Sequence, residues 1–179
     1  GVAALAFHEG VPGHHLQLQL ETDASLPAYR SLCEHTAFVE GWAMYAEGLP
    51  NFGDEVGRVE SELFRACRLV VDTGMHAFGW SLSKAEAYLA SHTHGSLSPQ
   101  EIRSEVVRYA ADPGQALAYA CGLHVFRTLL SSSSKEADDV VRSHQRWLRH
   151  GSLPLWLLLQ LEGRRRIRTR HTKRARRDL

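Results

Sequence analysis

The sequence predicts an all-α protein, and three observations favour this fold class. Apolar residues recur at helical spacing over residues 54–78, the longest periodic stretch of the chain. Helix-starting signals and Pro/Gly breakers divide the remainder into lengths that suit helices. The alternation typical of strands occurs clearly only at 16–20. Because no partner strand is evident, we expect that segment to be helical as well.

Helix breakers bound the first three expected helices. The first covers residues 3–21 and is interrupted near Pro12, whose ring and missing N–H disturb a helix. The second follows Pro27 and continues to Leu49, because the next four residues, Pro-Asn-Phe-Gly, favour a turn. The third covers residues 54–78, where the apolar side chains form one stripe.

Capping boxes, in which Ser and Glu three residues apart satisfy backbone N–H groups, start the next two helices. The fourth helix is expected to start with the box Ser83-x-x-Glu86 and the fifth with Ser98-Pro99-x-Glu101. An Asp-Pro-Gly break at 112–114 precedes a sixth helix, which is expected to reach about Leu130. A linker at 131–134 follows, and then a seventh helix over 135–150. A short apolar helix is expected after Pro154.

Composition excludes several classes of protein. The chain has 179 residues, enough for one domain with its own core, and its 44% hydrophobic content is ordinary. No apolar run reaches the roughly 18 residues that would span a bilayer, so no transmembrane segment is expected. The cysteines Cys33, Cys67 and Cys121 are odd in number and widely spaced. They indicate neither a disulfide framework nor a thiolate metal site, and we expect buried reduced thiols.

The charges are unevenly distributed along the chain. Residues 164–179 hold nine of the 21 Lys/Arg and one of the 20 Asp/Glu, which leaves 12 basic and 19 acidic residues in the body. We therefore expect a helical domain over 1–163 and a basic, disordered tail over 164–179. The acidic body argues against a nucleic-acid partner.

The segment 8–15, His-Glu-Gly-Val-Pro-Gly-His-His, suggests a metal site. Imidazoles are good zinc ligands, and a carboxylate beside them, here Glu9, suits a general base. The spacing differs from His-Glu-x-x-His, because position +4 from His8 is a proline. On a regular helix the next histidine, six residues on, lies ~240° round the axis, and the one after it lies ~10 Å along it.

A distorted helix removes this difficulty. Pro12 and Gly13 weaken the helix at the point where two extra residues need to be accommodated. A bulge there would bring His14 to the place of a normal +4 histidine. We therefore predict His8 and His14 as ligands, with His15 as the alternative second ligand.

A zinc site needs a third protein ligand, and the second helix offers Glu34, His35, Glu40 and Glu47. Glu40 is favoured because apolar and aromatic residues flank it, and a carboxylate drawn toward a core needs a partner. Glu47 lies two turns further on the same face. It is a candidate supporting group or an alternative ligand.

The third helix carries a polar stripe on an otherwise apolar surface. Arg65, Arg68, Asp72 and His76 follow one another at steps of three, four and four residues. Such a stripe can contact a substrate carboxylate or a developing oxyanion. It can equally be the solvated face of a surface helix.

Taken together, the motifs resemble the bacterial family called domain of unknown function 885, over about residues 1–160. The matching blocks are His-Glu-x-x-Pro-Gly-His-His-Leu-Gln at 8–17, Glu-Gly-Trp-Ala-x-Tyr-Ala-Glu at 40–47, Arg-Leu-Val-Val-Asp-Thr-Gly-x-His at 68–76, Gly-Trp-Ser at 79–81, Arg-Tyr at 108–109 and Pro-Gly-Gln-Ala-Leu-x-Tyr at 113–119.

That family is similar to helical zinc peptidases of the thimet-oligopeptidase kind. The resemblance implies Zn²⁺ as cofactor, a peptide substrate, a zinc-peptidase-like catalytic domain, and Glu9 as general base. It implies that Tyr119 or His76 stabilises the oxyanion, with Tyr45 and Tyr109 as competing tyrosines. The expected substrate-binding residues are Arg68, Asp72 and Arg108. Chains of the family are several times longer, so we expect this to be their C-terminal part, with a missing N-terminal part supplying one wall of the cleft.

Three other functions are alternatives to zinc-dependent peptide hydrolysis. A helical metal-binding or interaction module without catalysis is the main alternative. A di-iron carboxylate bundle uses Glu-x-x-His motifs, and none of the 13 glutamates has a histidine three residues later. Nucleic-acid binding through the tail conflicts with the acidic body.

Overall fold

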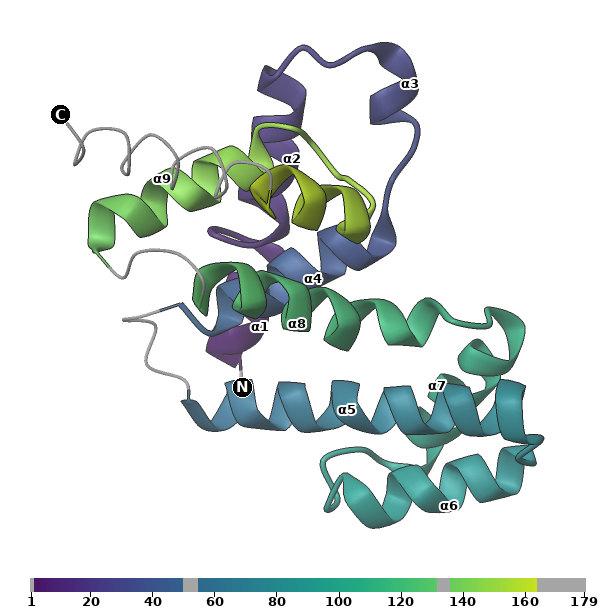
Figure 1. Ribbon diagram of the computed structural model, residues 1–179. Coiled ribbons are helices and arrows are strands. Elements are labelled where there is room, and N and C mark those ends of the chain that lie inside the picture. Colours follow the sequence, from purple (N-terminus) through teal and green to yellow (C-terminus); the bar gives the residue numbers. More distant parts are fainter. Residues whose placement is uncertain (1, 50–54, 132–135, 164–179) are drawn as a thin grey trace, which may run out of the picture.

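The protein is all-helical over the residues that the structure describes, which confirms the predicted fold class (Figure 1). This computed structural model describes residues 2–49, 55–131 and 136–163, and no strand occurs in these ranges. Its elements are α1 (Val2–Glu9), α2 (His14–Asp23), α3 (Ala28–Ser31), α4 (Thr36–Glu47), α5 (Glu55–Phe78), α6 (Leu82–His92), α7 (Pro99–Ala111), the 3₁₀ helix η1 (Gln115–Leu117), α8 (Ala118–Ser131), α9 (Ala137–Leu148) and a helical segment at 155–163.

The interruption near Pro12 is larger than the predicted bulge. α1 and α2 are separate helices joined by a turn over 10–13. Gly13 is required there, because a Cβ atom would lie 2.0 Å from the carbonyl oxygen of His8. The indole Nε1 of Trp42 donates a hydrogen bond of 2.8 Å to the carbonyl of Pro12. The turn is therefore fixed to α4.

The single helix predicted over 27–49 is wrong. α3 and α4 occupy this range, and residues 32–35 between them are not helical. The Arg30 guanidinium donates to the backbone carbonyls of His150 and Ser152 at 2.9 and 2.7 Å. These contacts come from more than a hundred residues away and override local helix propensity. Nothing in the sequence near the break signals them.

The predicted start of the fourth helix at Ser83 is also wrong. α6 begins at Leu82, and the Oγ of Ser81 accepts the capping hydrogen bond from the N–H of Lys84 at 3.2 Å. The chain turns at Gly79, whose φ is +64°. Because of this turn, Ser81 and not the predicted Ser83 occupies the capping position.

The other boundaries agree with the sequence. Ser98 and Glu101 form a complete capping box, and α5 covers the predicted third helix from its second residue on. The break at 112–114 is followed by η1 before α8 begins. Most of the linker at 131–134 and all of the tail at 164–179 lie outside the described residues.

The structure bears on two expectations drawn from composition, the burial of the cysteines and the lack of a transmembrane segment. Cys67 is buried, but Cys33 and Cys121 are exposed, which corrects the expectation of three buried thiols. In the described ranges, no helix combines the length and the apolar character needed to cross a bilayer.

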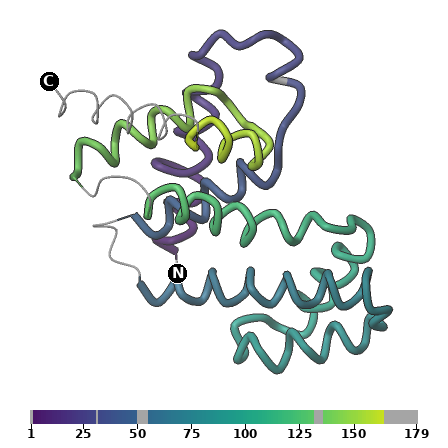
Figure 2. Tube along the Cα trace, in the orientation of Figure 1, coloured from purple at the N-terminus to yellow at the C-terminus, as the bar shows by residue number. Residues whose placement is uncertain are grey.

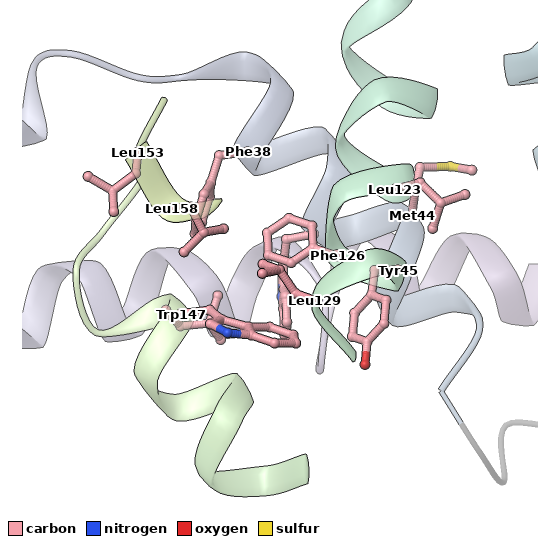
Figure 3. Packing of buried hydrophobic residues seen from close by; sticks show 11 residues of the cluster. Phe38, Met44, Tyr45, Leu123, Phe126, Leu129, Trp147, Leu153 and Leu158 are labelled. Carbon is pink, nitrogen blue, oxygen red and sulfur yellow. The ribbon is translucent and has the colours of Figure 1, made fainter. Parts of the chain in front are cut away.

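α4 is the central helix, with nine of its twelve residues buried. It lies along α8, and aromatic residues of both helices meet Trp147 of α9 (Figure 3). The Phe126 ring lies 5.3 Å from that of Phe38 and 5.6 Å from that of Trp42, in edge-on contact. The helix that carries Glu40 is thus held rigidly by the main core.

α4 and α8 approach each other most closely where two glycines meet. A Cβ atom on Gly41 would lie 2.3 Å from the Cα of Gly122. A Cβ atom on Gly122 would lie 2.1 Å from the carbonyl oxygen of Ala37. Any larger residue at either position forces the two backbones apart.

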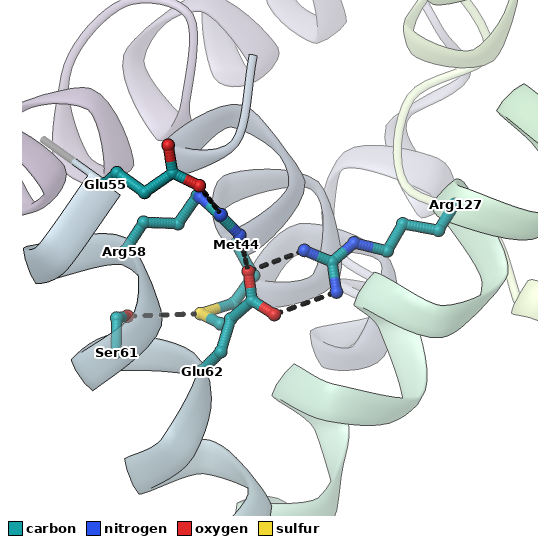
Figure 4. A network of polar contacts seen from close by, with 6 residues as sticks. All are labelled: Met44, Glu55, Arg58, Ser61, Glu62 and Arg127. Carbon is teal, nitrogen blue, oxygen red and sulfur yellow. Dashed lines mark hydrogen bonds and ion pairs between the residues drawn. The ribbon is translucent and has the colours of Figure 1, made fainter. Parts of the chain in front are cut away.

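A second core joins α5, α6 and α7 around residues such as Val71, Leu89 and Val106. α5 links the two cores, because Glu62 accepts from Arg58 of its own helix and from Arg127 of α8 (Figure 4). α1 contacts both α4 and α5, whose paths are seen in the tube view (Figure 2). α1, with its histidine, is therefore held between the two cores.

We expect Gly41→Ala to destabilise the fold by about 3 kcal/mol, because the added methyl group overlaps the backbone of α8. Gly48→Ala is the matched control, since its Cβ would make ordinary contacts with the flexible Arg58 side chain at 3.4 Å and the carbonyl oxygen of Tyr45 at 3.6 Å. Urea denaturation measures both changes. Equal effects of the two substitutions would contradict the close packing of α4 on α8.

The main core also contains a histidine that should make stability depend on pH. Nε2 of His144 lies 2.7 Å from the hydroxyl of Tyr45, and burial lowers the pKa of His144 to about 4. The folded state therefore resists protonation of this ring. The contribution of neutral His144 to the free energy of unfolding is complete above pH 6.5. It is lost as the pH falls through that value toward 4.

We expect the free energy of unfolding to fall by about 1 kcal/mol more in the native protein than in His144→Gln between pH 7 and pH 5. Denaturant titrations at the two pH values measure the difference. His124→Gln, at an exposed position of α8, should keep the native pH dependence. A His144→Gln variant with an unchanged pH dependence would refute this account.

Candidate metal site

Three predicted ligands converge where α1, α2 and α4 meet. Nε2 of His8 and Nε2 of His14 each lie 3.5 Å from the same oxygen, Oε2 of Glu40. The two imidazole rings are 4.8 Å apart and nearly perpendicular. One ligand atom from each residue falls within 4.8 Å of the others. The turn between α1 and α2 thus brings His14 close to His8, which is the effect expected of the predicted bulge.

The two histidines of the doublet have different surroundings. The turn over 10–13 interrupts the helix, and α2 begins at His14, whose ring is directed at Glu40. His15, the alternative second ligand, is exposed. The other candidates for the third ligand, Glu34 and His35, lie before α4 begins, and Glu34 is exposed.

His8 is held by a second carboxylate. Its Nδ1 lies 2.7 Å from Oε1 of Glu47, and both side chains are buried. When Nδ1 donates its proton to this carboxylate, Nε2 presents its lone pair toward Glu40. This is the arrangement by which carboxylates orient metal-binding histidines. Glu47, considered from sequence as either ligand or support, has the geometry of a support.

The charges of the site favour a cation. Burial alone would lower the pKa of His8, but hydrogen bonds to Glu40 and Glu47 outweigh it and raise the pKa to about 9. Burial would likewise raise the pKa of Glu40, yet hydrogen bonds to His14 and His8 lower it to about 2. A place that attracts an extra proton between carboxylates attracts a metal cation for the same electrostatic reason.

The dimensions of the site suit zinc. With Zn–N and Zn–O bonds of roughly 2.0–2.1 Å in a tetrahedral arrangement, ligand atoms lie about 3.4 Å apart. The two distances of 3.5 Å to Glu40 are close to this value. Two imidazoles and one carboxylate form a ligand set that zinc accepts, leaving a fourth position open. Residues from three helices can therefore hold such an ion with little movement.

The predicted general base lies at the edge of this group. Glu9 is the last residue of α1, directly after His8, and its side chain is exposed. Tyr119, a predicted oxyanion stabiliser, is half-buried, and its ring is stacked on the Arg68 guanidinium at 4.1 Å. The other candidate, His76, has Nε2 at 2.9 Å from the carbonyl of Tyr109, in the second core.

The three predicted substrate-binding residues lie in a polar network that joins α5 to α7 and to the segment 112–117. Arg68 is buried and lies 3.8 Å from the carboxylate of Glu105. Arg108 donates to the same carboxylate, and Asp72 accepts from the N–H of Gly114 at 3.0 Å. These contacts fix α5 relative to α7, and the role of the three residues toward substrate stays a prediction.

Sequence reasoning missed the distinct position of Arg65. It stands in the predicted stripe with Arg68, but the charges of Glu40 and Glu47 both act on its guanidinium. Only the folded chain shows that Arg65 lies near these two carboxylates. The paired Tyr45 and His144 were missed too, because they are 99 residues apart.

In the metal-free protein we expect the His8 ring to titrate with a pKa near 9, and Glu47→Gln to lower that pKa toward 6.5, because it removes a charged acceptor. NMR titration of the ring resonances measures this. Because the pKa of His8 is raised in the folded state, protonated His8 adds to the free energy of unfolding. This contribution is complete below pH 6.5 and is lost as the pH rises through 9. Glu34→Gln, an exposed acid, should leave the titration unchanged.

Two solved structures share this fold. A candidate lipoprotein from Colwellia psychrerythraea matches with a TM-score of 0.80 and 36% identity, over 90% of this chain and 29% of that protein. A candidate lipoprotein of unknown function from Shewanella oneidensis matches with a TM-score of 0.74 and 26% identity, over 88% of this chain and 30% of that protein. The chain therefore spans less than a third of the length of either protein.

No curated protein matches the chain. The description of neither solved structure mentions a peptidase, so the relation to thimet-oligopeptidase-like enzymes has no support from these comparisons. A family match extends over residues 1–161, which is nearly the whole helical domain and contains every predicted site residue. The chain belongs to the family described as bacterial protein of unknown function (DUF885).

Proposed function

We propose that this chain carries a zinc-dependent hydrolase site that cleaves peptide bonds. The observation that supports the proposal is the convergence of His8, His14 and Glu40 within 4.8 Å. A second carboxylate, Glu47, orients the buried His8 in the manner expected of a metal ligand. The predicted general base, Glu9, is adjacent in the chain to the first ligand, His8.

Each residue has a defined task in this proposal. His8, His14 and Glu40 would hold the zinc ion, which when bound would supply a water molecule with a pKa of about 7 and polarise a carbonyl group. Glu9 accepts the proton of the attacking water and passes it to the leaving amine. The Tyr119 hydroxyl donates to the developing oxyanion, and the arginines beside its ring favour negative charge there. His76 is the second candidate, with one ring nitrogen held by a backbone carbonyl.

The alternative is a metal-binding module without catalysis in this chain. It is favoured by the exposure of Glu9 and by the short span of the chain relative to its solved relatives. A general base acts best in a cleft from which water is excluded. A segment of a longer protein would have to supply the covering wall.

Metal analysis and peptide turnover separate the two functions. We expect about one zinc ion per chain, lost in His8→Ala and His14→Ala and retained in His15→Ala, the matched control from the same doublet. Glu9→Gln should keep the zinc and lose hydrolysis by at least ~100-fold, because the proton acceptor is removed.

Each other outcome has a definite meaning. Full activity of Glu9→Gln would overturn the assigned mechanism. Zinc binding without cleavage, by this chain and by the longer protein, would establish the module. Absence of zinc from the native chain would remove the basis of the proposal.

A further inference from the structure

One half-buried cation close to the candidate metal site, Arg65, forms no direct ion pair within the described residues. The other buried or half-buried arginines of the described residues (Arg30, Arg58, Arg68, Arg108 and Arg146) each lie near a carboxylate or donate to backbone carbonyls. Arg65 has neither within the described part of the chain, and its buried Nε, like those of Arg68 and Arg146, has no hydrogen-bond partner there. A buried donor without a partner is unfavourable.

Arg65 lines a small cavity beside the ligand set. The cavity has a volume of about 190 Å³ and lies between α1, the end of α4, α5 and residues 96–97. Glu47, which holds His8, lines the same cavity, as does the exposed acid Glu60. The Arg65 guanidinium carbon is 5.6 Å from the centre of the Tyr119 ring. Arg65 therefore lies between the support of the metal ligand and the tyrosine assigned to the oxyanion.

Glu47 and Glu40 are the carboxylates whose charges act on Arg65, and neither forms a direct ion pair with it. A divalent cation held by His8, His14 and Glu40 would neutralise these two carboxylates and leave the charge of Arg65 available to a ligand. Its neighbour Arg68 already has Glu105 at 3.8 Å and the face of Tyr119 at 4.1 Å. The planar guanidinium of Arg65 suits a carboxylate that arrives with the substrate.

We propose that Arg65 binds the free C-terminal carboxylate of a short peptide substrate. This inference rests on the proposed function and specifies its substrate class: peptides cut close to their C-terminus. Arg65 thus favours peptides that end near the metal over longer or amidated ones.

Calorimetric titration with three N-acetylated probes tests this: an Ala-Phe dipeptide with a free carboxylate, its carboxamide, and an Ala-Glu dipeptide carboxamide. The zinc-loaded chain should bind the free acid at least ~10-fold more tightly than the carboxamide. Arg65→Gln should reduce this ratio to about twofold, and Arg65→Lys should keep part of it. Arg149→Gln, at an exposed arginine directly after α9, should leave the ratio unchanged.

The controls separate this inference from the proposed function. Zinc content and the unfolding midpoint are measured for each variant, and both should match the native chain. A native chain that binds zinc but does not prefer the acid refutes the role of Arg65 alone, whereas a chain without zinc refutes the proposed function. Tight binding of the Ala-Glu carboxamide would overturn the C-terminal assignment. An altered zinc affinity with an unchanged ratio would show that Arg65 only balances Glu47.

Discussion

The buried contact between His8 and Glu47 is the constraint on which the site depends. It joins two residues 39 positions apart, one at the end of α1 and one at the end of α4, at 2.7 Å. Both side chains are removed from water, so each needs the other to satisfy its polar atoms. This contact fixes the ring of the first ligand and sets the direction in which its second nitrogen faces.

The rest of the fold holds these two groups in place. α4 is buried on most of its surface, and the glycine contact with α8 allows the two backbones to come unusually close. The aromatic cluster around Phe126 then fills the space on either side. Because α4 cannot shift without disturbing this core, the carboxylates that it carries are preorganised for a ligand that arrives later.

The turn over 10–13 is the second structural device of the site. A helix of regular period cannot direct His8 and His14 at one point, and the turn breaks that period between the two residues. Its geometry requires Gly13, and the hydrogen bond from Trp42 anchors it to the same helix that supplies Glu40. The site and the core are thus held by the same contacts, so a substitution that disturbs one should also disturb the other.

Local sequence signals are enough to predict the fold class, most helix boundaries and the three converging residues. These signals are the helical spacing in α5, the Ser98–Glu101 cap, and the break at Pro12. Four features appear only in the folded chain: the break between α3 and α4, the start of α6, the support of His8 by Glu47, and the position of Arg65 near Glu47. These depend on residues far apart in the chain, whose mutual distance is set by packing and not by local propensity.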